Sequence, residues 1–170
     1  MEEVRRRISQ GELSCLHHQI GKAVWYLQYV EEALGYLYVV KGVIVEPYSM
    51  SQKDAEQNLR KTQTKTLGSL LKAIETRSLI KDALLTDLKN FNMARRWLIH
   101  KSLIESGDEL YTDSGRKCTF DRIENFITEV IRLQKLIGSE TTSYCVSKGI
   151  SEDWINAKAE RDIRLLREGD

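Results

Sequence analysis

The chain has 170 residues, of which 41% are hydrophobic and one is proline, and its 26 Lys and Arg residues nearly balance 25 Asp and Glu residues. This length fits a single domain, since one hydrophobic core commonly holds roughly 100 to 200 residues. A net charge of +1 excludes the uniformly basic surface of a bulk nucleic-acid coat and the acidic balance of a disordered tail. Any electrostatic partner must therefore be met by a local patch.

Cysteine usage and the N-terminal residues indicate the compartment. Cys15, Cys118 and Cys145 are odd in number and far apart, which favours free thiols in a reducing environment. No apolar segment follows the basic start of the chain, and no stretch reaches the roughly 18 apolar residues that span a bilayer. We therefore expect a cytoplasmic protein with no membrane contact.

Hydrophobic periodicity predicts helices from the start of the chain. An apolar seam with alternating steps of four and three residues consists of Leu16, Ile20, Ala23, Leu27, Val30, Leu34 and Leu37. The helix that carries this seam should begin near residues 9–14 and end around Val40. Residues 51–63 are polar and are compatible with either a short helix or a loose connection.

The middle of the chain predicts a short helix and then a long one. Thr66 should cap a helix that starts at Leu67 and ends near Arg77. One stripe of the long helix consists of Ile80, Leu84, Leu88, Phe91, Arg95, Leu98 and Ser102. Only polar residues are expected on the opposite side of this helix. It should stop at residues 106–108, and residues 109–117 should form an exposed loop.

The last third predicts two more helical segments. The first uses the apolar residues Ile123, Phe126, Ile127, Val130, Ile131, Leu133, Leu136 and Ile137. Gly138 should close it, and residues 141–148 should add a helical turn. Ser151 should then cap a helix that runs to Arg167.

Together these segments predict an all-α fold, a four- to five-helix up-and-down bundle. We expect a single domain over residues 1–170, with a core bundle at about 12–137 and a C-terminal helical extension at about 139–168. Gly-rich phosphate loops, Cys-x-x-Cys pairs, Gly-x-Ser-x-Gly elbows and His-Glu-x-x-His helices are all absent from the sequence. The common nucleotide, zinc and hydrolase signatures therefore assign no function.

Charge is distributed unevenly along the chain. Residues 60–101 hold ten Lys or Arg against three Asp or Glu, a net of +7, whereas the rest holds 16 against 22, a net of −6. A solvated helix face accounts for such a stretch as well as a binding patch does. Residues 90–101, inside this window, contain the densest group of chemically capable side chains.

This group offers an arginine and a histidine for phosphodiester chemistry. On an α-helix Arg96 and His100 are about 40° apart, and Arg95 and His100 about 140°. A neutral imidazole can take the proton of a ribose 2′-hydroxyl, and a guanidinium can stabilise charge on the phosphate oxygens. The alternative is that His100 is a hydrogen-bonded surface or interface residue and that Arg95 pairs with a carboxylate across the bundle.

Residues 94–100, Ala-Arg-Arg-Trp-Leu-Ile-His, resemble the Arg-x4-6-His motif of the HEPN superfamily (higher eukaryotes and prokaryotes nucleotide-binding). Residues 66–70, Thr-Leu-Gly-Ser-Leu, and the helix after them resemble the layout of prokaryotic members. The resemblance implies a helical bundle that dimerises, so that the Arg and His of both subunits face a shared cleft. Active members are metal-independent ribonucleases of toxin–antitoxin and phage-defence systems, and other members are non-catalytic binding modules.

We therefore expect a HEPN-like endoribonuclease that needs no metal or cofactor and acts on RNA as a homodimer, with an antitoxin or other protein as a further partner. Arg95 and His100 are the predicted catalytic residues, and Arg96, Lys101 and Asn92 are the predicted RNA contacts. The alternative function is a non-catalytic dimeric adaptor or a nucleotide- or protein-binding HEPN module.

Two other groups of residues carry weaker signals. Cys15, His17 and His18 do not predict a zinc site, because adjacent histidines on a helix point to different faces and no second ligand pair is near. The aromatic residues Trp25, Tyr26, Tyr29, Tyr36 and Tyr38 are more typical of a core edge or a subunit interface than of base stacking.

Overall fold

The computed structural model describes residues 4–168, and these form helices joined by short links. The α-helices are α1 (Gln10–Val39), α2 (Gln52–Gln63), α3 (Leu67–Thr76), α4 (Asp82–Arg96), α5 (Ser102–Ser106), α6 (Asp113–Ser147) and α7 (Glu152–Glu168). Two π-helical turns, η1 (Val40–Ile44) and η2 (Trp97–Lys101), and a 3₁₀ turn, η3 (Glu109–Tyr111), complete the set. The predicted all-α bundle is confirmed over the described part of the chain.

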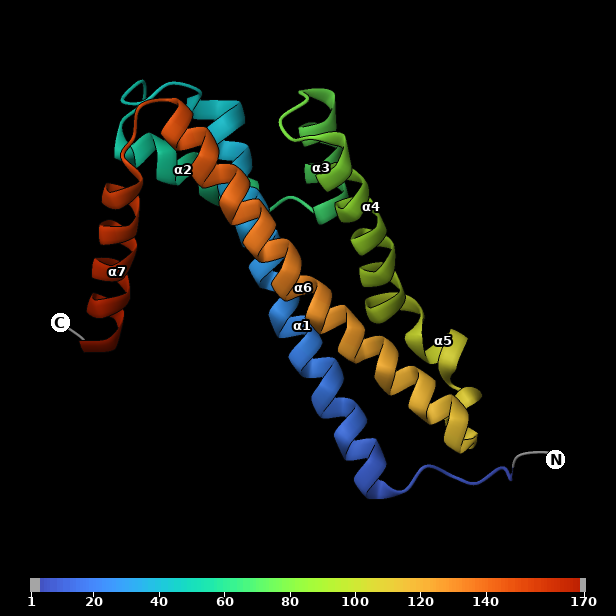
Figure 1. The fold of residues 1–170 in the computed structure, drawn as a ribbon. Helices are drawn as coiled ribbons and strands as arrows, with labels where there is room; N and C mark the ends of the chain where they lie inside the picture. The colour runs from blue at the N-terminus through green and yellow to red at the C-terminus, as the bar shows by residue number, and fades with distance from the viewer. Residues whose placement is uncertain (1–3, 169–170) are drawn as a thin grey trace.

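The two longest helices, α1 and α6, form the centre of the bundle. They pack against each other and run in the same direction, while α4 runs the opposite way along α6 (Figure 1). The short helices α2 and α3 cover the end of the bundle at which α1 finishes. Chain direction therefore alternates from α1 to α4, α6 and α7, as an up-and-down bundle requires.

The core is built from the predicted seam of α1 and one face of α6. Six of the seven α1 seam residues are buried, and Ile20 is half-buried. The buried apolar residues of α6 are Ile123, Phe126, Ile127, Val130, Leu133 and Ile137. Ile131 and Leu136 were expected in this set but are exposed, because each lies about 100° around the helix from a buried neighbour.

Capping residues explain where the short helices begin. Residues 51–63 do form a helix, α2, and the Ser51 hydroxyl accepts a hydrogen bond from the Asp54 backbone N–H. Thr66 caps α3 in the same way by accepting from the Ser69 N–H, which confirms the predicted start. The buried face of α3 consists of Leu67, Leu70, Leu71 and Ile74.

Residues 109–117 were expected to form an exposed loop, and most of this prediction is wrong. Helix α6 already begins at Asp113, with Thr112 as its cap, and Arg116 is buried. The chain turns so tightly here that a Cβ atom at Gly115 would lie 2.2 Å from the carbonyl oxygen of Glu109. The turn-forming residues therefore mark a compact helix start.

Gly138 does not end the helix, so that prediction is also wrong. Helix α6 continues through Gly138 to Ser147, since one glycine inside a helix costs only about 1 kcal/mol. The turn after α6 contains Gly149 with a φ of 85°, and Ser151 then begins α7. Among the helices of residues 4–168, none has the length and apolar character needed to cross a membrane.

Candidate functional site

The predicted Arg–His segment lies where α4 changes into the π turn η2. In this turn the hydrogen bonds skip one residue more than in an α-helix, and the Ser102 N–H donates to the carbonyl oxygen of Trp97. Residues five apart therefore come closer in azimuth than the 140° of an ideal α-helix. His100 lies within this turn, and Arg95 lies in α4 just before it. Such π turns are frequent at functional sites.

Trp97 anchors the π turn in the core. Its ring is 97% buried, and the Arg122 guanidinium from α6 lies over it, 3.7 Å from the ring centroid. Six residues earlier, Phe91 stacks on Phe126 of α6 with the ring centroids 4.9 Å apart. These contacts fix α4 and η2 against α6, so the residues on the other side of η2 are held by a rigid support.

Arg95 is half-buried between α4 and α1. Its Nε donates to Oε1 of Glu31 on α1 at 3.2 Å, and 22% of its side chain is exposed. This is the carboxylate partner across the bundle that the sequence left open as an alternative. A guanidinium has five N–H donors, so a bond from Nε leaves the Nη donors for a second partner. Glu31 therefore fixes the direction of Arg95 without saturating it.

His100 is exposed at the end of η2. Within residues 4–168 its imidazole makes no hydrogen bond or ion pair. Arg96 is exposed as well, and Lys101 is exposed with a 3.4 Å ion pair to Glu105, one turn further along. Exposed ion pairs of this kind contribute little to stability, so Lys101 can exchange Glu105 for another partner.

Asn92 lies apart from His100. It is half-buried, and its amide nitrogen is 3.5 Å from the position that a Cβ at Gly68 would take, so it faces the start of α3. The five predicted site residues thus fall into two groups. Arg95 and Asn92 lie toward α1 and α3, whereas Arg96, His100 and Lys101 face solvent. Their roles stay predictions.

The exposed side of α4 and α5 is not purely polar, contrary to the prediction. Met93, Leu103 and Ile104 are all exposed, the last two to 80% and 84%. Together with Arg96 and His100 they make up an exposed, partly apolar set of residues along α4, η2 and α5. We call these five residues the α4–α5 stripe. Sequence reasoning missed it because it followed the buried face through Arg95 and did not test the opposite one.

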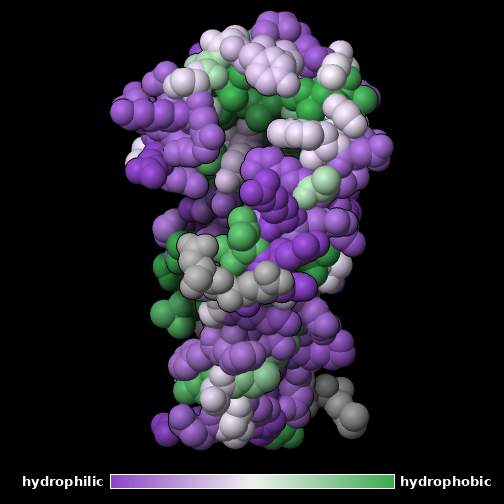
Figure 2. All heavy atoms as spheres, turned by 90° about the vertical axis from the view of Figure 1, so that its left-hand side faces the viewer, coloured by the Kyte–Doolittle hydropathy of each residue, from purple (hydrophilic) through white to green (hydrophobic). Residues whose placement is uncertain are grey.

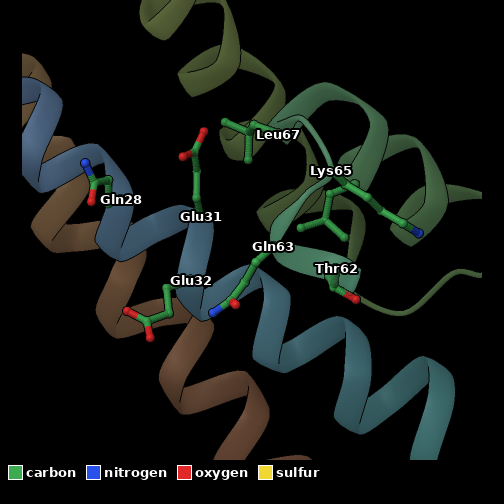
Figure 3. A pocket seen from close by; sticks show the side chains of 8 residues that line it. Gln28, Glu31, Glu32, Thr62, Gln63, Lys65 and Leu67 are labelled. Atoms are coloured by element: carbon green, nitrogen blue, oxygen red, sulfur yellow. The ribbon is translucent and has the colours of Figure 1, made fainter. Parts of the chain in front are cut away.

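A cleft beside Glu31 lies between α1, the end of α2 and the start of α3 (Figure 3). Its volume is about 320 Å³, and it is lined by Gln28, Glu31, Glu32, Thr62, Gln63, Lys65, Leu67 and Leu70. The Glu31 side chain points toward Leu67, and those of Glu32 and Gln63 lie near one another on the far side (Figure 3). Two carboxylates against one lysine make this cleft unsuited to phosphate.

The basic window of residues 60–101 does not form one patch. Lys65 and Arg77 lie over the ring of Tyr38, near the start of α4, and Lys89 pairs with Glu75 at 2.5 Å. Along α4 this end is about 20 Å from Arg95, at 1.5 Å per residue. The net charge of +7 is therefore spread over the length of the bundle, and the cations at the site are Arg95, Arg96 and Lys101.

The other candidates from the sequence are located on α1. Cys15, His17 and His18 are all exposed, and no group of three or more metal-ligating side chains is found among the described residues. Of the aromatic residues, Tyr38 is buried and Tyr26 half-buried, whereas Trp25, Tyr29 and Tyr36 are exposed. The indole N–H of Trp25 donates to the Tyr29 hydroxyl at 3.2 Å.

Comparisons with known proteins give no assignment: no family model matches the chain, and no curated protein or solved structure matches it either.

Proposed function

We propose that the chain is a metal-independent endoribonuclease of the HEPN type, active as a homodimer. The observation that carries this proposal is the state of two side chains that lie five residues apart. His100 presents an exposed imidazole with no partner among the described residues, and Arg95 is oriented by Glu31 of α1. The resemblance of residues 94–100 to the Arg-x4-6-His motif adds the reaction class.

In the proposed reaction His100 takes the proton from a ribose 2′-hydroxyl. The 2′-oxygen then forms a bond to phosphorus and the bond from phosphorus to the 5′-oxygen breaks, which leaves a 2′,3′-cyclic phosphate and a 5′-hydroxyl. The departing 5′-oxygen takes up a proton from a protonated imidazole. The Nη donors of Arg95 stabilise the charge that builds on the phosphate oxygens, while Arg96 and Lys101 hold the neighbouring backbone.

A second copy of the chain completes the proposed site. Met93, Leu103 and Ile104 flank His100 and are exposed to water in one chain. Large apolar residues grouped on a surface mark an interaction site, and a two-fold contact buries the same stripe on both subunits. Such a contact across the α4–α5 stripe brings two His100 side chains to one cleft, so that one supplies the base and the other the acid.

The direct test is cleavage of single-stranded RNA by the purified protein in the presence of EDTA. We expect cleavage with a cyclic phosphate product, and a loss of at least about 100-fold in His100→Ala. The matched control is His18→Ala, which removes an exposed histidine on α1 and should keep full activity. Unchanged cleavage in His100→Ala would overturn the proposal.

A second function, a non-catalytic helical adaptor, is favoured by one observation. The ion pair with Glu31 gives Arg95 a structural role that requires no substrate. This function predicts no RNA cleavage and no growth arrest when the protein is overproduced. The adaptor would be excluded if overproduction of the parent chain and of His18→Ala arrests growth while overproduction of His100→Ala does not.

A further inference from the structure

Helix α7 stands away from the bundle that precedes it. It follows a sharp turn at Gly149 and descends beside the bundle as a separate rod (Figure 1). Of its side chains over residues 152–167, only Ile155 is half-buried and the others are exposed. An isolated helix of 17 residues is marginal in water, since most helical stability in proteins comes from packing an apolar face. A partner that covers α7 is therefore expected on physical grounds.

The apolar residues of α7 lie on two sides of the helix, with Trp154 and Leu165, 59% and 53% exposed, on one side and a row of four on another. Ile155, Ala159, Ile163 and Leu166 follow steps of four, four and three, which places them on one side of the helix. Ile163 is 49% exposed and Leu166 87%. Figure 2 shows the side of the molecule from which α7 projects, where hydrophobic residues interrupt a largely hydrophilic surface. We call these four residues the α7 seam.

Charge along α7 restricts the kind of partner. Residues 152–167 contain four acidic and four basic side chains, so the segment has no net charge to attract an anionic membrane or a nucleic acid. The charges are sorted by end. Glu152 and Asp153 lie in the first turn, whereas Arg164 and Arg167 lie at the other end. A second α7 in the opposite direction places each acidic end beside a basic end.

We propose that α7 binds α7 of a second copy of this chain as an antiparallel two-fold pair centred on Ala159. Around this centre Ile155 meets Ile163 of the partner subunit, and Glu152 comes near Arg167 of the partner subunit. The small side chain of Ala159 lets the two helices approach closely where they cross. The pair of Lys158 and Asp162, at 3.2 Å within one helix, leaves the end charges free for this contact.

This contact is independent of the proposed ribonuclease. It lies on the opposite side of the molecule from α5, so it does not involve the α4–α5 stripe (Figure 1). A helix of 17 residues is about 25 Å long and offers less area than a standard interface of about 1,600 Å². The pair is therefore a weak one, with dissociation in the micromolar range.

Cysteine cross-linking tests the centre of the pair. In Ala159→Cys the two new thiols face each other across the two-fold axis, within the Cα separation of about 4.4–6.8 Å that a disulfide needs. Mild oxidation should give a covalent dimer in this variant. The matched control is Ala157→Cys, which places the thiol on the opposite side of α7. This control and the parent chain, which has three native cysteines, should both stay largely uncross-linked. Equal cross-linking in both variants, or none in Ala159→Cys, would overturn the proposal.

Charge exchange tests the direction of the pair. Sedimentation equilibrium should show a weak association through α7, separate from any dimer formed through the α4–α5 stripe. Its dissociation constant should rise about two- to fivefold in Glu152→Arg and in Arg167→Glu. The double variant restores the pairing and should return to within twofold of the parent. Additive weakening in the double variant would contradict an antiparallel contact. RNA cleavage, measured in parallel, should not change in any of these variants, so failure of one proposal leaves the other standing.

Discussion

Arg116 and Arg95 are two arginines on neighbouring helices that the fold treats differently. Arg116 is 4% exposed, and its guanidinium bonds to Glu12, to Asp113 and to the carbonyl oxygen of Leu110. Arg95 is 22% exposed and bonds to one carboxylate through Nε. A buried arginine with three partners holds structure together, whereas a more exposed one with a single partner can receive a further anion. The contrast separates a structural site from a candidate functional one.

The corner around Arg116 also fixes the N-terminal residues. Arg6 bonds to both Glu12 and Asp113, at 2.7 and 2.9 Å, and its backbone N–H donates to the Tyr111 carbonyl. Two arginines and two carboxylates thus tie the starts of α1 and α6 together. Burial of Arg116 without such partners would cost several kcal/mol, which is why this corner is complete in its hydrogen bonds.

The largest expected effect is on activity at Arg95. We predict that Arg95→Ala lowers RNA cleavage at least about 100-fold, because charge on the phosphate is no longer stabilised. Its free energy of unfolding should fall by only about 1 kcal/mol, as expected for a partly exposed ion pair. Cleavage rates and urea titrations measure the two quantities. A large stability loss without a specific activity loss would make Arg95 a second structural arginine.

Arg116 should behave in the opposite way. We predict that Arg116→Met lowers the free energy of unfolding by about 2–3 kcal/mol, since several charge-assisted hydrogen bonds are lost at once. The folded fraction should keep its cleavage rate per molecule. Thermal unfolding and active-site-normalised cleavage test this outcome, and a stability change below about 0.5 kcal/mol would contradict it.

Glu31 orients Arg95 and is expected to act through it. We predict that Glu31→Gln lowers kcat about 10-fold with little change in KM, because the amide oxygen holds the guanidinium less firmly than a carboxylate does. The neighbouring Glu32→Gln, in the same cleft, is the matched control and should behave as the parent. A change confined to KM would instead place Glu31 in substrate binding.

The Arg116 corner should be sensitive to acid. The hydrogen bond from Arg6 holds the pKa of Glu12 far below its usual range, and the bond from Arg116 lowers the pKa of Asp113. The folded state therefore binds fewer protons than the unfolded one, so this stability is present above about pH 5 and is lost as the pH falls further. The free energy of unfolding, measured from pH 7 to 3, should decrease over this range. In Glu12→Gln the decrease should be smaller.

The smallest effect is on thiol reactivity. Burial raises the pKa of the Cys145 thiol, whereas Cys15 and Cys118 are exposed. Cys145 should therefore react with a thiol reagent more slowly than Cys15 and Cys118 at neutral pH. Labelling of the chain should show two fast phases and one slow phase. Equal rates for all three would show that the end of α6 opens readily.

Periodic residues made the fold predictable, whereas the site depends on contacts between distant segments. The α1 seam and the Thr66 cap follow from local spacing and side-chain chemistry, and both are confirmed. The early start of α6 was missed because Thr112 and Gly115 serve equally well in a loop and in a helix cap. Local sequence did not reveal that Arg116 completes the corner and makes that start compact.

The site itself was only partly accessible from the sequence. Arg95 and His100 were found from their chemistry and spacing, but the partner of Arg95 is 64 residues away on another helix. No local pattern identifies Glu31 among the carboxylates of α1. The π turn was also unforeseen, and its Trp97 packs under Arg122 of α6, a contact between distant segments. Tertiary packing decides both features.

The pairing of α1 with α6 sets an order of events during synthesis. The seam of α1 is complete at Leu37, but the buried face of α6 that packs against it ends at Ile137, about 100 residues later. At about 5–20 residues per second, the ribosome takes roughly 5–20 s to make that interval. For this time a nascent α1 has no α6 to bury its leucines, and Glu31 has no Arg95 during the first part of it. The chain therefore acquires its core late, because α1 is made well before the helix that covers its leucines.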